Sequence, residues 1–160
     1  MGYRSDVAYE ILVPNETAIE VLAHLRLTHD DPKHMKEAIE KLRTYKANMH
    51  PGKVIIRYHA DCVKWYEDFA DVQALDAIFD EFRERSANGD NCSGLFYRVG
   101  EEGGDLEHKE FGEEYGWSSI DVVPQVLRVE EIENEMNVRD FVEEQNEISR
   151  TTPETTAATS

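Results

Sequence analysis

The sequence has few cysteines, few basic residues and no long apolar segment. The two cysteines, Cys62 and Cys92, lie far apart among 160 residues, which favours reduced thiols in a cytoplasm over a disulfide framework. No apolar run approaches the roughly 20 residues of a membrane span, and the polar start, Met1 to Asp6, lacks the apolar stretch of a signal peptide. Lysine and arginine number 17 against 34 acidic residues. This balance disfavours nonspecific binding to nucleic acid or membranes and favours basic partners.

The net charge of −17 is unevenly distributed along the chain. Residues 1–100 contain 17 acids and 13 bases, whereas residues 101–147 contain 16 acids and 3 bases. The hydrophobic share of 40% is typical of a globular domain. We therefore expect one acidic domain over residues 1–149. Residues 150–160 are rich in threonine and have no large apolar side chain, so we expect a disordered tail.

Hydrophobic periodicity predicts an α+β domain. The expected strands are 5–13, 53–59, 95–99, 106–111 and 120–129. The expected helices are 15–28, 31–46, a third from Asp68 or Asp71 to about residue 88, and 130–149. The order β-α-α-β-α-β-β-β-α favours a mostly antiparallel sheet of about four to five strands, with amphipathic helices packed on one face.

Particular residues support these boundaries. Val7, Tyr9 and Ile11 alternate with polar or small residues, which predicts a strand with one buried face. Asp31 precedes a proline and is a strong helix start. The apolar stripe that follows extends the predicted second helix through Tyr45.

The sequence gives no metal, cofactor or catalytic signature. His24, His29 and His34 are spaced five apart and do not share a helical face. Cys62 would need activation by a histidine such as His59 to act as a nucleophile, and a small buried hydrophobe is the more ordinary role of a free cysteine. The glycine-rich loop from residue 100 to 105 carries acids and no following lysine, so it predicts a hairpin turn and not a phosphate site. We expect a protein without enzymatic activity.

Aromatic and basic residues near strand ends and loops provide candidates for a small-ligand site. Such residues together can form a stacking pocket for a nucleotide, although they also form ordinary core edges and protein interfaces. The candidates are Tyr3, Arg4, Lys64, Trp65, Tyr66 and Arg98.

Acidic residues of the last predicted helix form a second candidate surface. Carboxylates three or four positions apart on a helix are about 5–6 Å from one another, and such an array can imitate the phosphates of a nucleic acid. A solvated helix face is the ordinary alternative. The candidates are Glu131, Glu133, Glu135, Asp140, Glu143, Glu144 and Glu147.

Three blocks of the sequence carry a resemblance. They are MGYRSDV at 1–7, DCVKWYEDFADVQA at 61–74 and YRVGEE at 97–102. They resemble an uncharacterised family of small bacteriophage and prophage proteins that begin MGYRS(D/E)V and carry a DxVKWY…DVQA motif. The resemblance implies a phage origin and a place in the bacterial host's cytoplasm. It assigns no binding residue, and residues 118–160 lie outside it.

Three hypotheses follow for the function. The first is a non-enzymatic accessory protein that binds a basic host protein that handles nucleic acid or acts in defence, with no direct nucleic-acid or membrane binding. The second is a protein that binds or sequesters a nucleotide, and the third is a minor component of the virion. The sequence leaves the oligomeric state open.

Overall fold

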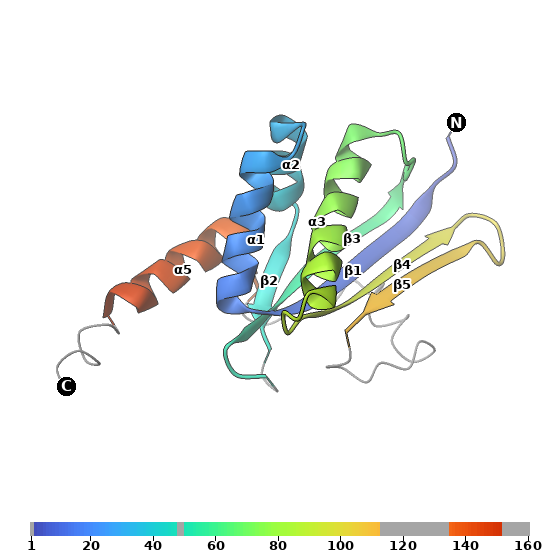
Figure 1. The fold of residues 1–160 in the computed structure, drawn as a ribbon. Coiled ribbons are helices and arrows are strands. Elements are labelled where there is room, and N and C mark those ends of the chain that lie inside the picture. Colours follow the sequence, from blue (N-terminus) through green and yellow to red (C-terminus); the bar gives the residue numbers. More distant parts are fainter. Residues whose placement is uncertain (1, 48–49, 113–134, 152–160) are drawn as a thin grey trace.

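Six strands form one antiparallel sheet in the order β5-β4-β1-β3-β2-β6 (Figure 1). The computed structural model describes residues 2–47, 50–112 and 135–151. The strands are β1 (Ser5–Pro14), β2 (Arg43–Lys46), β3 (Lys53–Val63), β4 (Ser93–Gly100), β5 (Leu106–Phe111) and β6 (Met136–Asn137). The α+β class and the antiparallel sheet are thus confirmed, and the described residues contain more strands than the four to five expected.

Three helices cover one face of this sheet (Figure 1). They are α1 (Asn15–Thr28), α2 (Pro32–Glu40) and α3 (Ala70–Ala87). Asp31 caps α2 as expected, because its Oδ1 accepts a hydrogen bond from the His34 amide at 3.2 Å. In the described part of the chain, no helix combines the length and apolar character needed to cross a membrane.

The core lies between the helices and the central strands. Val7, Tyr9 and Ile11 of β1 are fully buried beneath the helices, as their alternation predicts. The opposite face of β1 differs from a solvated one, since Ala8 and Leu12 there are also 0% exposed. Strand β1 lies between β3 and β4 and is hydrogen-bonded to both. The side chains on each of its two faces therefore lie near the centre of the sheet.

The prediction of a second helix through Tyr45 is wrong. Helix α2 ends at Glu40, and the next residues form β2, where Tyr45 pairs with Ile55 of β3. Thr44 is 1% exposed and its Oγ1 donates to the Met136 carbonyl of β6 at 3.1 Å. The threonine and tyrosine suit a strand, and pairing with β3 outweighs the helical pattern that they also fit.

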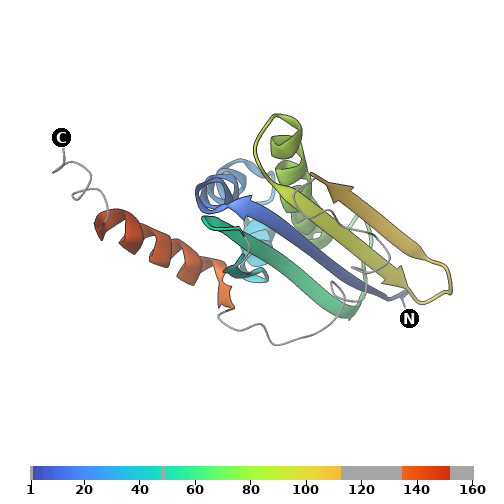
Figure 2. The ribbon, with the colours of Figure 1, turned by 90° about the horizontal axis from the view of Figure 1, so that it is seen from below.

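The last helix starts later than expected. Helix α5 runs over Val138–Thr151, and Asn137 caps it by accepting the Asp140 amide at 2.8 Å. Arg150 and Thr151 therefore belong to the helix and not to the tail predicted from residue 150. The expected strand at 120–129 and residues 152–160 lie outside the described residues. Helix α5 does not cover the sheet but projects from the domain (Figure 2).

Candidate functional site

The ligand candidates Tyr3, Arg4, Lys64 and Tyr66 gather where β1 begins. The Tyr66 Oη accepts a hydrogen bond from the Tyr3 amide at 2.7 Å. An added Cβ at Gly2 would lie 3.0 Å from the Lys64 Cε, so the lysine stem lies beside this turn. Arg4 donates from Nη1 to the Cys62 carbonyl at 3.3 Å. The structure thus brings these four residues together, although Tyr3, Arg4 and Tyr66 already bind backbone groups of the same domain.

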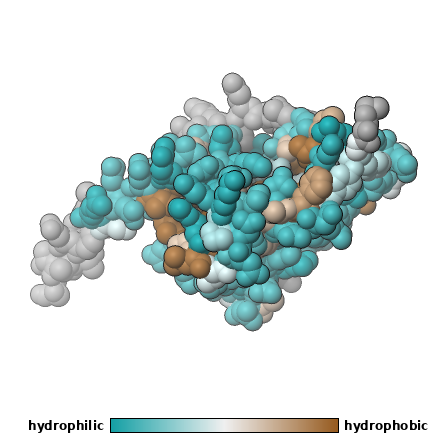
Figure 3. All heavy atoms as spheres, turned by 90° about the horizontal axis from the view of Figure 1, so that it is seen from above, coloured by the Kyte–Doolittle hydropathy of each residue, from teal (hydrophilic) through white to brown (hydrophobic). Residues whose placement is uncertain are grey.

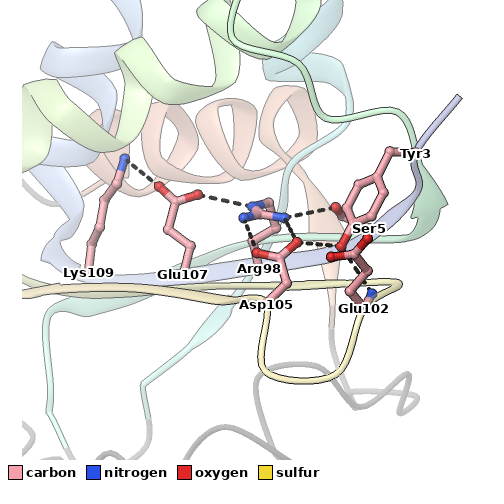
Figure 4. A network of polar contacts seen from close by, with 7 residues as sticks. All are labelled: Tyr3, Ser5, Arg98, Glu102, Asp105, Glu107 and Lys109. Atoms are coloured by element: carbon pink, nitrogen blue, oxygen red, sulfur yellow. Dashed lines mark hydrogen bonds and ion pairs between the residues drawn. The ribbon is translucent and has the colours of Figure 1, made fainter.

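Arg98 is surrounded by acceptors from its own domain (Figure 4). Its Nη2 lies 2.9 Å from Asp105 Oδ1, and its Nε lies 3.1 Å from Glu107 Oε1. Its Nη1 also donates to the Ser5 hydroxyl at 3.1 Å. The hydrogen bond with Asp105 raises the pKa of the guanidinium further. Arg98 therefore fixes the β4–β5 hairpin, and its charge is already balanced by two carboxylates.

Tyr3 extends the same polar network to the start of the chain. Its hydroxyl donates to Asp105 Oδ2 at 2.5 Å and accepts from the Glu102 amide at 3.1 Å (Figure 4). Hydrogen bonds from Arg98 and Tyr3 hold the pKa of Asp105 below its usual value. A side chain at Gly100 would collide with Tyr3 and Asp105, so the glycine makes room for this contact.

The position of Trp65 indicates a role in packing and not in ligand binding. Its ring is partly buried, with centroids 6.0 Å from Tyr58 and 6.2 Å from Phe96. It therefore extends the aromatic cluster under the helices. Together with the balanced charge of Arg98, this position weakens the hypothesis of a nucleotide pocket at this end of the sheet.

The cysteines and histidines have varied surroundings. Cys92 is buried and its Sγ donates to the Phe82 carbonyl at 3.3 Å, whereas Cys62 is exposed, against the expectation of a buried hydrophobe. Cys62 lies opposite Asp6, where the register of β1 and β3 shifts, and its φ is 55°. A β-bulge at this point turns the residue outward. His59 contacts Asp61 at 3.4 Å. Among the described residues, no group of three or more metal-ligating side chains is placed to hold an ion.

The acidic candidates separate into three groups. Glu131 and Glu133 lie outside the described residues. Glu135 precedes β6, is not helical, and lies 3.3 Å from Arg43 Nε. The remaining four are on α5: Asp140, Glu143, Glu144 and Glu147. The array expected on one helix is therefore reduced, in the described residues, to four carboxylates.

These four carboxylates share the outer side of α5. At 3.6 residues per turn they fall within an arc of roughly 100°, away from the anchoring residues Val138 and Phe141. Those anchors are 6% and 4% exposed, whereas every side chain from Asn146 to Arg150 is exposed. The helix is thus buried at its base, and its ribbon projects from the domain (Figures 1 and 2). Asp140, Glu143 and Glu147 are exposed, and Glu144 is half-buried.

The structure adds charged residues in the interior that the search for motifs missed. Glu10 lies on the helix-free face of the sheet, where Tyr45 donates to its Oε1 at 3.1 Å and Arg57 Nε is 3.6 Å away. Burial raises the pKa of Glu10, although Arg57 and Tyr45 oppose the shift. Burial also raises the pKa of Asp76 on α3 to about 6. Glu10 and Arg57 could have been found from the sequence, because each is a charged residue inside an otherwise apolar strand.

Comparison with known proteins adds no relative. No protein-family model, curated protein or solved structure matches the chain. The arguments about function therefore depend on the residues themselves.

Proposed function

We propose that the protein is a non-enzymatic accessory protein that binds a basic protein partner through the acidic outer face of α5. The observation that carries this proposal is the placement of four carboxylates in one arc of a helix whose buried residues Val138 and Phe141 lie at its base. The partner belongs to the nucleic-acid-handling or defence proteins of a bacterial host, in whose cytoplasm the protein acts. The resemblance of three sequence blocks to phage and prophage proteins supports this setting.

Electrostatics favour such a complex. Neighbouring carboxylates on a helix are about 5–6 Å apart and repel one another by a few tenths of a kcal/mol. Lysine and arginine of a partner replace this repulsion with attraction, and the chain's net charge of −17 increases the rate of encounter with a basic surface. A partner that normally binds phosphates, of which each DNA strand has one per about 3.4 Å of helix axis, has cations suited to such a line of charge.

A pull-down with matched charge variants tests the proposal. The full chain would be used as bait in a bacterial host lysate at low and high salt. One variant neutralises the four α5 carboxylates as Asp140→Asn, Glu143→Gln, Glu144→Gln and Glu147→Gln. The control neutralises four exposed acids elsewhere, as Glu16→Gln, Glu37→Gln, Asp68→Asn and Glu84→Gln, and changes the net charge equally.

The expected result is a partner that is captured at low salt, released at high salt and displaced by short duplex DNA. The α5 variant should lose this partner, and the control should retain it. Equal capture by the α5 variant and the parent protein would refute the role of α5. Equal loss by both variants would show that net charge alone is responsible.

A further inference from the structure

A groove of about 740 Å³ lies between α1, α2 and the base of α5. Its apolar lining comes from all three helices and consists of Ile19, Leu22, Ala23, Ile39, Val138 and Val142. Figure 3 shows hydrophobic atoms gathered where α5 leaves the body of the domain. Small organic ligands occupy pockets of about 300–1,000 Å³ with mostly apolar linings. The groove thus has the size and the lining of a small-molecule site.

The charges around this groove contrast with those of the whole chain. Arg26 of α1, Lys36 of α2 and Arg139 of α5 line it, and all three side chains are exposed. In residues 2–47, 50–112 and 135–151, no carboxylate forms an ion pair with any of the three. In a chain with twice as many acids as bases, three cations without an ion pair among the described residues form a local exception around one apolar groove.

Three other charged residues, one basic and two acidic, complete the lining. Arg43 also lines the groove, and its Nε is held 3.3 Å from Glu135. Glu40 and Glu143 are the lining acids. The cations of the lining therefore outnumber its acids, and a ligand that supplies a negative charge complements the rim.

We propose that this groove binds an organic anion with an apolar body, such as an acyl or aryl carboxylate or phosphate. The apolar body lies against Ile19, Ala23 and Val142, whose side chains are exposed or half-buried, and removes them from water. The anionic head pairs with Arg26, Lys36 and Arg139, whose hydrogen bonds to a charged group are stronger than those to a neutral one. The proposal differs from partner binding by α5 because its cations and apolar lining lie outside the acidic arc, although Glu143 belongs to both surfaces.

A panel of amphiphiles below their aggregation concentrations tests the proposal by calorimetric titration. Dodecanoate and dodecyl phosphate supply the anion as a carboxylate or a phosphate. Dodecanol and dodecyltrimethylammonium supply the same apolar body without negative charge, and inorganic phosphate supplies the charge without the body. We expect the two anionic amphiphiles to bind about tenfold or more tightly than the other three probes, since charge-assisted contacts are worth that factor. The ratio of their affinities distinguishes a carboxylate site from a phosphate site.

Matched variants locate the binding. Lys36→Glu and Arg139→Glu should each weaken binding of the anionic amphiphiles about tenfold, and Ala23→Trp should block the groove. Lys33→Glu on α2 and Arg150→Glu on α5 make the same charge changes at exposed positions outside the groove and should leave the affinity unchanged. Equal affinities across the panel, equal effects of groove and control variants, or no binding of any probe would overturn the proposal. Unchanged melting temperatures of the variants would exclude misfolding as the cause.

Discussion

Asp76 on α3 provides the sharpest prediction about stability. The pKa of this carboxyl is raised from 3.8 to about 6, chiefly by burial; Lys109 opposes the rise, and Asp80, Glu107 and Glu67 add to it. A difference of this size between folded and unfolded states corresponds to about 3 kcal/mol without screening. Because part of the side chain reaches water, we expect Asp76→Asn to raise the free energy of unfolding at neutral pH by about 1–2 kcal/mol.

The direction of the pH dependence follows from the same shift. Between about pH 4 and pH 6 the folded protein binds the Asp76 proton more tightly than the unfolded chain, so the parent protein loses stability as the pH rises through this window. The asparagine variant does not titrate at this position. Its advantage over the parent should therefore be small near pH 4, grow through the window and level off above about pH 6.

Urea unfolding of the parent and the variant at about pH 4, 6 and 8 measures this difference. Glu84→Gln is the control, because Glu84 is an exposed acid on the same helix and its neutralisation should change stability by less than about 0.5 kcal/mol at every pH. An Asp76→Asn gain no larger than that of the control at neutral pH would refute the reasoning. A gain of the same size at about pH 4 would show that repacking, and not titration, is its cause.

Three further substitutions test the packing of the domain. Gly94→Ala places a Cβ against the ring of Phe111, so the free energy of unfolding in urea should fall by about 1–3 kcal/mol; an unchanged value would mean that the ring moves freely. Arg98→Ala removes the centre of the hairpin network, so hydrogen exchange of the Gly100 amide should accelerate about tenfold while core amides are unaffected. Phe141→Ala removes a buried anchor of α5, so helical circular dichroism should fall by up to the contribution of its 14 residues without global unfolding. Full helicity would show that other contacts hold α5.

Much of the fold could be predicted because local pattern and tertiary structure agree there. Strand β1 combines alternation with β-forming residues, and α2 begins at an aspartate followed by proline, so each boundary has a local cause. At Arg43–Lys46 the local sequence pattern and the tertiary structure conflict. The residues fit a helical stripe, but β3 offers an unpaired edge, and that edge lies far away in the sequence until the chain folds.

The pairing register of β4 and β5 decides which residue lies opposite Arg98. The predicted hairpin loop from Gly100 to Asp105 already places Val99 opposite Leu106 and therefore Arg98 opposite Glu107, as the structure has it. Extending the hairpin by two residues would have shown that this cation has a partner. The groove could not be predicted in this way. It depends on how α1, α2 and α5 pack against one another, and the spacing of residues within each helix does not contain that information.

Glu143 lies one helical turn from Arg139 and lines the groove with it, so it belongs to both surfaces of α5. For carboxylates farther from the groove cations, the size of the helix limits how strongly the charges interact. An α-helix with its side chains is about 10–12 Å across. At that separation two unit charges in water interact by roughly 0.4 kcal/mol, and physiological salt screens even this. The carboxylate of Glu147, about two turns from Arg139, therefore changes the affinity of an anion in the groove by only about a factor of two. Failure of partner binding would thus leave the groove experiment interpretable, and loss of anion binding would leave the acidic face intact.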